Sequence, residues 1–178
     1  MRAKYICLTI LFLPFILYAS IFSSDSIVHP EVDQNGMVVS QHYLASSVGA
    51  QILEDGGNAY DASIAVAFAL AVVLPRAGNI GGGGFMVMYD EKTNKSYSID
   101  YREKAPALAS KDMYLNDDGS VNKKRAREGI LSIGVPGTVY GMWEVHKKFG
   151  SLPWEKLLDP AIKLAEEGFI MSPFMVDA

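Results

Sequence analysis

Eleven consecutive apolar residues, from Ile64 to Leu74, limit the folds open to this chain more than any other part of its sequence. Asn58 stands before the run and can cap a helix. Pro75 can end that helix, because proline lacks the N–H group that a helix interior uses. A helix that is apolar on every side is buried on every side, and eleven residues fall well short of the roughly 20 that span a membrane. The run therefore predicts a core helix that ends near Leu74.

Further helices and one hairpin are predicted around this core helix. A short buried strand is expected over residues 37–40, and a helix over residues 44–55 that ends at two glycines, which adopt the left-handed conformation without a steric penalty. Residues 85–89 and 96–100 predict an antiparallel hairpin whose first arm is mostly buried. More helices are predicted over residues 138–148 and from residues 154, 159 and 172 onward. Helices packed on an antiparallel hairpin indicate the α+β class rather than a doubly wound sheet.

The composition suits one globular domain that has no nucleic-acid partner. Of the 178 residues, 49% are apolar and 20% are charged, and the net charge is -4. Disorder requires few apolar residues and a high net charge, so it is not expected here. The densest basic patch, Lys123 to Arg127, lies among Asn, Asp and Gly and is interpreted as a solvated loop rather than a nucleic-acid-binding surface.

The first residues differ from the rest of the chain. Met1–Lys4 is basic, Ile6–Phe22 is almost wholly apolar, and small and polar residues follow. This order predicts a secretory signal peptide over residues 1–24 and a periplasmic or extracellular mature chain without a membrane span. The alternative is an uncleaved membrane anchor, but 17 residues that include Pro14 are fewer than the roughly 20 of a spanning helix. Cys7, the only cysteine, lies in this segment, so the mature chain is expected to form no disulfide.

No complete catalytic or metal-binding motif occurs in the sequence. It contains no G-x-S-x-G, no H-E-x-x-H and no G-x-x-x-x-G-K-[ST]. The histidines His29, His42 and His146 have no carboxylate or cysteine at ligand spacing, so neither a metal site nor a cofactor is expected. Gly81–Gly84 follows a helix and precedes a strand, which is the reverse of a phosphate-binding loop. The glycines instead predict a close approach between two stretches of main chain.

Arg102 is the one candidate binding residue, because it stands at the exit of the second hairpin strand. Its planar guanidinium group suits bidentate binding of a carboxylate. The residues alone also allow a structural role, in which Arg102 pairs with Asp100 or Glu103. No residue is assigned a catalytic role.

Four motifs resemble those of the gamma-glutamyltransferase family. They follow one another in order at family spacing, so that the resemblance extends over nearly all of residues 37–170, and this makes it far more specific than a single glycine motif. In this sequence they are GGNAYDA at 56–62, PRAGNIGGGGFM at 75–86, DYREKAP at 100–106 and GVPGTVYG at 134–141.

The resemblance implies an N-terminal-nucleophile hydrolase with a four-layer αββα sandwich, of which this chain would hold an incomplete part. In that family a precursor cleaves itself into a large and a small subunit. The new N-terminal threonine of the small subunit attacks the gamma-glutamyl amide of glutathione and related compounds. Water, an amino acid or a peptide then receives the gamma-glutamyl group. Arg102 matches the family's arginine that binds the donor's α-carboxylate, and Tyr101 stands where many members carry phenylalanine.

On this basis residues 25–178 are expected to be the N-terminal part of a large subunit, and the chain alone is expected to be inactive because it lacks the threonine. Two alternatives stay open. One is a related acylase of the same fold that acts on beta-lactam side chains, and the other is an exported binding module without catalysis. Retention of Arg102 favours a gamma-glutamyl donor.

Overall fold

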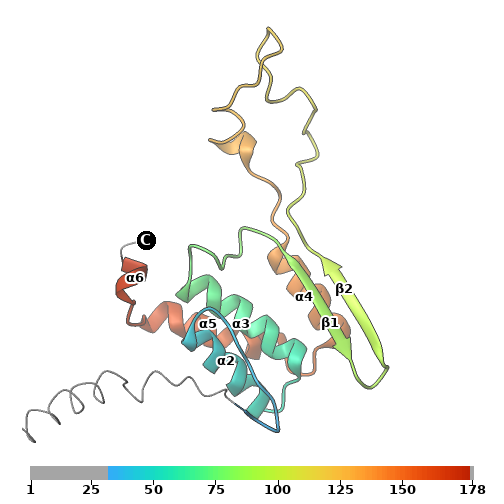
Figure 1. Cartoon of the computed structure of the whole chain (residues 1–178), viewed down its shortest axis with the longest axis vertical. Coiled ribbons are helices and arrows are strands. Elements are labelled where there is room, and N and C mark those ends of the chain that lie inside the picture. Colours follow the sequence, from blue (N-terminus) through green and yellow to red (C-terminus); the bar gives the residue numbers. More distant parts are fainter. Residues whose placement is uncertain (1–31, 177–178) are drawn as a thin grey trace, which may run out of the picture. The chain divides into compact units, whose positions relative to one another are not determined.

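The predicted core helix is present as α3 (Ala59–Val73) in the computed structural model, which describes residues 32–176 (Figure 1). A reciprocal capping box starts the helix. The side-chain oxygen of Asn58 accepts from the N–H groups of Tyr60 and Asp61, at 2.8 and 3.0 Å, while the Asp61 carboxylate accepts from the Asn58 N–H at 3.0 Å. Pro75 follows the C-cap residue Leu74. The sequence therefore predicted both ends of α3.

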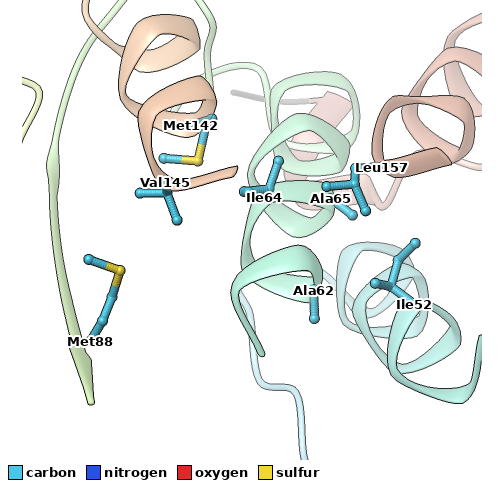
Figure 2. Packing of buried hydrophobic residues seen from close by; sticks show 8 residues of the cluster. All are labelled: Ile52, Ala62, Ile64, Ala65, Met88, Met142, Val145 and Leu157. Carbon is cyan, nitrogen blue, oxygen red and sulfur yellow. The ribbon is translucent and has the colours of Figure 1, made fainter. Parts of the chain in front are cut away.

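Three helices pack on α3, namely α2 (Tyr43–Glu54), α4 (Thr138–Phe149) and α5 (Trp154–Glu167). Ile64 and Ala65 of α3 and Leu157 of α5 are completely buried. In Figure 2, α3 lies between α4 and the other two helices, with its labelled side chains directed at both. The expectation that residues 64–74 are buried on every side holds only in part, because Val66, Phe68, Leu70 and Val72 are half-buried.

A two-stranded antiparallel sheet, β1 (Phe85–Asp90) and β2 (Lys95–Asp100), packs on the helices through one face only. Its register pairs Phe85 with Asp100 and Asp90 with Lys95. Met88 is buried in the helical core, whereas alternate side chains on the opposite face of β1 are exposed, those of Phe85, Val87 and Tyr89. The prediction of a mostly buried first arm was therefore wrong. In a strand, neighbouring side chains point to opposite faces, and the helices cover only one of them.

Residues 105–134 form an excursion between the hairpin and α4, which we call the arm. It runs away from the hairpin and returns to the start of α4 (Figure 1). The arm contains a short 3-10 helix, η2 (Ile130–Ser132), and an isolated bridge between Leu115 and Val121. None of its residues is buried.

Two further expectations were wrong. Residues 37–40 have no regular structure, because no strand among the described residues lies beside them to share hydrogen bonds. The helices expected from residues 154 and 159 are one continuous helix, α5, with Pro160 inside it. Proline removes one helical hydrogen bond, and the burial of Leu157 and Ala161 on either side of it favours the unbroken helix. The short helix α6 (Pro173–Val176) begins where the Ser-Pro signal predicted.

The turn between α4 and α5 is joined to the start of α3 by hydrogen bonds. The fully buried Asp61 carboxylate accepts from the N–H of Ser151 at 3.1 Å and from the Ser151 hydroxyl. Asn58 Nδ2 donates to the carbonyl of Phe149 at 2.7 Å. The bonds to Asp61 are charge-assisted and so among the stronger ones in proteins, and together these contacts hold the α4–α5 corner on α3.

Aromatic side chains fill the space between α4 and α5. The rings of Trp143 and Trp154 meet edge to face with centroids 5.2 Å apart, and the His146 ring lies 5.7 and 5.2 Å from them. His146 Nε2 lies 2.8 Å from the carbonyl oxygen of Leu152 and can donate to it. His146 therefore belongs to the packing of this corner.

The described residues form an α+β arrangement of helices and one two-stranded sheet, as the sequence predicted. Among residues 32–176, no helix is both long and apolar enough to cross a membrane. The predicted signal segment, residues 1–24, lies outside the described residues.

Candidate substrate-carboxylate site

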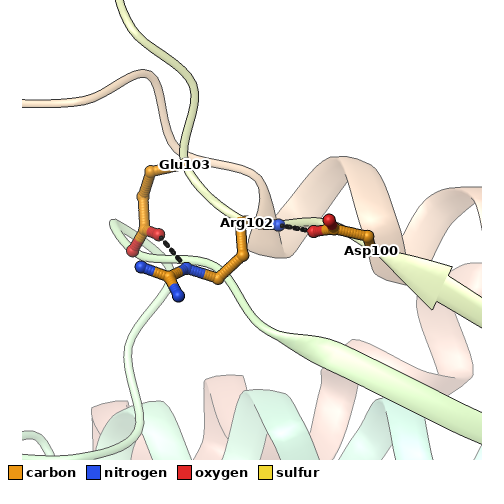
Figure 3. A network of polar contacts seen from close by, with 3 residues as sticks. All are labelled: Asp100, Arg102 and Glu103. Carbon is orange, nitrogen blue, oxygen red and sulfur yellow. Dashed lines mark hydrogen bonds and ion pairs between the residues drawn. The ribbon is translucent and has the colours of Figure 1, made fainter.

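Arg102 lies two residues beyond β2, and its side chain is 61% exposed. Its main-chain N–H donates to Asp100 Oδ1 at 2.9 Å, and its Nε donates to Glu103 Oε2 at 3.1 Å (Figure 3). The guanidinium carbon lies 5.8 Å from the centroid of the Phe85 ring, which is within range of a cation–π contact. The Glu103 carboxylate and the Phe85 ring therefore flank the exposed guanidinium group, while Asp100 binds the Arg102 main chain.

The sequence suggested that Arg102 pairs with Asp100 or with Glu103, and the structure shows a different contact for each carboxylate. Asp100 binds the main chain of Arg102, and Glu103 forms the ion pair with its side chain. Glu103 contacts the Nε of the guanidinium fork, and within residues 32–176 neither Nη group forms a hydrogen bond. An arginine can bind two partners through different edges of its fork. The pair with Glu103 therefore leaves the Nη edge available for a second partner.

Glu103 is held in its ionised form. Its own main-chain N–H and the Arg102 guanidinium lower the pKa of this carboxyl below its ordinary value. Hydrogen bonds to the charged form favour that form. At neutral pH the Glu103 carboxylate is therefore charged and can pair with Arg102 Nε.

Three segments meet at Arg102, and we call this crossing of residues 82–84, 101–104 and 135–138 the glycine junction. Main-chain hydrogen bonds join all three. Tyr101 N–H donates to Gly84 O at 2.9 Å, Lys104 and Val135 exchange bonds of 3.1 and 2.8 Å, and Gly82 O accepts from Gly137 and Thr138 at 2.8 and 3.1 Å. Through the last two bonds Gly82 O satisfies main-chain N–H groups at the start of α4, because its N-cap residue, Gly137, has no side chain that could do so.

Glycines line the main chain of Tyr101–Glu103. A Cβ atom on Gly83 would lie 2.5 Å from Tyr101 O and 2.8 Å from Arg102 Cα. A Cβ on Gly137 would collide with Tyr101 O, and one on Gly141 would collide with the Tyr101 ring. Burial raises the pKa of Tyr101, so its hydroxyl stays neutral and can donate to Phe85 O at 3.4 Å. The glycine run thus makes the close main-chain approach that its sequence predicted.

Sequence reasoning selected Arg102 as a candidate but missed its surroundings. It treated the glycine run and the segment from Gly134 to Gly141 as separate pieces of scaffold, whereas the structure places both against Tyr101–Glu103. The available signal was that both segments lack side chains at several positions and flank the hairpin in sequence. Among the residues that the structure describes, no three His, Cys, Asp or Glu side chains gather as a metal site would require. His42 caps α2, with Nδ1 accepting from Leu44 N–H at 3.3 Å.

Comparison with known proteins places these features in one family. The sequence model described as gamma-glutamyltranspeptidase matches residues 45–178. The glutathione hydrolase proenzyme of Pseudomonas aeruginosa is 49% identical over 160 residues, which are 90% of this chain and 28% of that protein. The proenzyme of the same name from Escherichia coli is 44% identical over 153 residues, which are 86% of this chain and 26% of that protein. The chain thus spans little more than a quarter of the length of these relatives.

Solved structures of related proteins also resemble this chain. Gamma-glutamyltranspeptidase of Helicobacter pylori superposes with a TM-score of 0.79 and 47% identity, over 84% of this chain and 42% of that one. The cephalosporin acylase of Bacillus halodurans matches with a TM-score of 0.68 and 30% identity, over 88% of this chain and 29% of that one. The αβ core is therefore part of an N-terminal-nucleophile hydrolase fold. With its family model matched over three quarters of its length, this chain belongs to the gamma-glutamyltranspeptidase family.

Proposed function

We propose that this chain is part of an exported gamma-glutamyltransferase, or glutathione hydrolase, that cleaves gamma-glutamyl amides. Membership of the family and the relatives named glutathione hydrolase proenzyme support the reaction class. The observation that carries the proposal is Arg102, an exposed arginine whose Nε is bound to Glu103 and whose Nη edge is open. This geometry suits the α-carboxylate of a gamma-glutamyl donor.

In the proposed reaction Arg102 binds and orients the donor. A threonine hydroxyl of a small subunit, made by self-cleavage of the precursor, attacks the gamma-carbonyl carbon. The amide C–N bond breaks, and the amine leaves with the proton. Water, an amino acid or a peptide then attacks the ester, takes the gamma-glutamyl group and returns the proton to the threonine. Residues 25–178 supply the carboxylate site, and the threonine belongs to the small subunit, the proposed partner of this chain.

The alternative acylase function has weaker support. The cephalosporin acylase match shares 30% identity, whereas the glutathione hydrolase relatives share 44 to 49%. The Arg102 site also suits a donor that carries an α-carboxylate beside its reacting amide. A proenzyme made this way and carrying a signal peptide over residues 1–24 would act in the periplasm or outside the cell.

The test is substitution of Arg102 in the full-length protein that contains this chain. Arg102→Ala should raise the donor KM about 30-fold or more. A bound donor would cover the exposed guanidinium, and truncating one partner of a desolvated charge pair costs roughly 2–5 kcal/mol. Arg102→Lys should recover only part of this loss, because an ammonium group cannot reproduce the planar fork. Acceptor KM should barely change. The exposed Arg127 of the arm provides a matched control, and Arg127→Ala should leave the donor KM unchanged.

A structural role for Arg102 predicts a different result. Loss of the Arg102–Glu103 pair would then impair self-cleavage and lower the melting temperature, while the mature enzyme kept its donor KM. Processing, melting and donor KM are therefore measured on one preparation. A mature Arg102→Ala enzyme with unchanged donor KM rules out the carboxylate site, and a wild-type protein that does not hydrolyse a gamma-glutamyl anilide rules out the proposed function.

A further inference from the structure

The glycine run Gly81–Gly84 takes no part in the proposed reaction. Side chains added at three of its positions would meet very different surroundings. A Cβ atom on Gly81 would have no atom within 4 Å. On Gly84 it would touch the Tyr101 ring, at 3.0 to 3.2 Å. On Gly83 it would lie within 2.8 Å of the main chain of three consecutive residues, Tyr101, Arg102 and Glu103. Alanine at Gly81, Gly84 and Gly83 would therefore make no contact, a tight contact and a severe contact, in that order, with the segment that carries Arg102.

A Cβ atom at Gly83 would meet main-chain atoms that cannot easily move away. A side chain in the way can turn to another rotamer, but main-chain atoms move only when their segment moves. Restoring an ordinary contact distance at Gly83 requires a displacement of about 1 Å. Gly137 meets the same carbonyl, because a Cβ atom on it would collide with Tyr101 O and would lie 3.0 Å from Arg102 O. Two glycines from distant parts of the sequence therefore contact the Tyr101–Glu103 main chain.

The glycine contacts and main-chain hydrogen bonds together hold the main chain from which Arg102 projects. Tyr101 N–H ties this segment to Gly84, just before β1, and the next residue, Lys104, exchanges two bonds with Val135, shortly before α4. Glu103, which orients Arg102 Nε, lies in the same segment. Displacing this segment would shift the guanidinium and its orienting carboxylate together.

We propose that Gly83 and Gly137 are positioning residues of the Arg102 carboxylate site, because their missing side chains let two other segments lie directly against the Tyr101–Glu103 main chain and so set the direction in which Arg102 projects. The proposal rests on the proposed function, in which Arg102 binds the donor. Misplacing a binding group by about 1 Å can cost a factor of roughly 100 in rate. The effect of these glycines on catalysis should therefore pass through Arg102.

The experiment introduces alanine at Gly81, Gly84 and Gly83 in the full-length protein, each with Arg102 intact and with Arg102→Ala. With Arg102 intact, kcat/KM for a gamma-glutamyl anilide should stay unchanged for Gly81→Ala. It should fall a few-fold for Gly84→Ala and about 10-fold to 100-fold for Gly83→Ala, mainly through donor KM. With Arg102→Ala, the same glycine substitutions should each change kcat/KM by less than about 2-fold, because coupled residues are not additive.

A purely structural role predicts something else. Gly83→Ala would then lower kcat/KM by the same factor in both backgrounds, and this result would overturn the proposal. If Gly83→Ala yields no mature protein, Gly84→Ala is tested in its place. Its added Cβ would contact only the Tyr101 ring, which can shift slightly, so this variant should perturb the fold less. Equal losses for Gly84→Ala with and without Arg102, or an unchanged kcat/KM with Arg102 intact, would also count against the proposal.

Crystal structures of Gly81→Ala, Gly84→Ala and, where it matures, Gly83→Ala give a readout that needs no activity. After superposition on α3 and α4, the Arg102 guanidinium and the Glu103 carboxylate should keep their place in Gly81→Ala and be displaced together in the other variants, by about 1 Å in Gly83→Ala. No displacement in the variants whose added Cβ contacts Tyr101–Glu103 would overturn the proposal. A wild-type protein inactive on the anilide would remove the proposed function, and the structures would still test whether these glycines position Arg102.

Discussion

In the helical core, side chains such as Leu157 and Ile64 are completely buried, whereas no residue of the arm is buried. The core is stabilised by apolar burial around α3 and by the Asp61 carboxylate beneath the α4–α5 turn. The arm is ordered by hydrogen bonds close in sequence, such as Asn122 N–H to Tyr114 O at 2.7 Å, and by its base at Lys104 and Val135. The two regions should therefore respond differently to the loss of a side chain.

Removal of the Asp61 carboxylate should have the largest effect on stability. Asp61→Ala leaves the N–H and hydroxyl of Ser151 and the N–H of Asn58 without their acceptor, and should lower the free energy of unfolding of this chain by about 3–4 kcal/mol. Urea denaturation measures the loss. Asp55→Ala is the control, since the exposed Asp55 side chain accepts only from Gln51 among the described residues and should cost about 0.5 kcal/mol or less.

Truncation in the apolar part of the core should have the next largest effect. Leu157 is completely buried against α3, so Leu157→Ala should cost about 2–4 kcal/mol through lost burial and a residual cavity. Ile162, on the same helix, is 47% exposed, and Ile162→Ala should cost about 1 kcal/mol or less. Equal losses at the two positions would show that α5 does not pack as described.

Truncation in the arm should have almost no effect on the stability of this chain. Leu108 is 97% exposed and Ile130 is 83% exposed, so replacing either with alanine should change the free energy of unfolding by about 0.5 kcal/mol or less. The same urea denaturation applies. A loss above about 2 kcal/mol would mean that the arm buries its aliphatic side chains in solution, and the contrast with the core would disappear.

The smallest expected effect is the pH dependence at the base of the arm. Its own N–H and the Arg102 guanidinium depress the pKa of Glu103, so the ionised carboxylate stabilises the fold above its unfolded pKa, and this contribution is lost as pH falls through the lower folded pKa. An NMR titration of Glu103 should give a midpoint below the usual glutamate value of about 4.3. In Arg102→Ala the pKa should rise only part of the way, because the main-chain bond remains. A midpoint at or above the usual value in the wild-type chain would contradict this account.

The sequence predicted the core better than the sheet and the site. Asn58, Gly56 and Pro75 mark helix ends through local chemistry, so α2 and α3 could be placed within a residue or so. Burial on β1 and the absence of a strand at residues 37–40 depend on which elements lie nearby, and the alternation of apolar residues cannot show that. The convergence of Gly83 and Gly137 on Arg102 likewise depends on the fold, because these positions lie 54 residues apart.

Trp143 and Trp154, which pack edge to face, give this chain an intrinsic fluorescence signal. These are the two tryptophans of the whole sequence, and both lie at the α4–α5 corner beside His146. Their fluorescence will therefore report the separation of α4 from α5, whereas opening of the arm, which contains no tryptophan, will leave the emission unchanged. An unlabelled sample can thus distinguish melting of the core from motion of the arm.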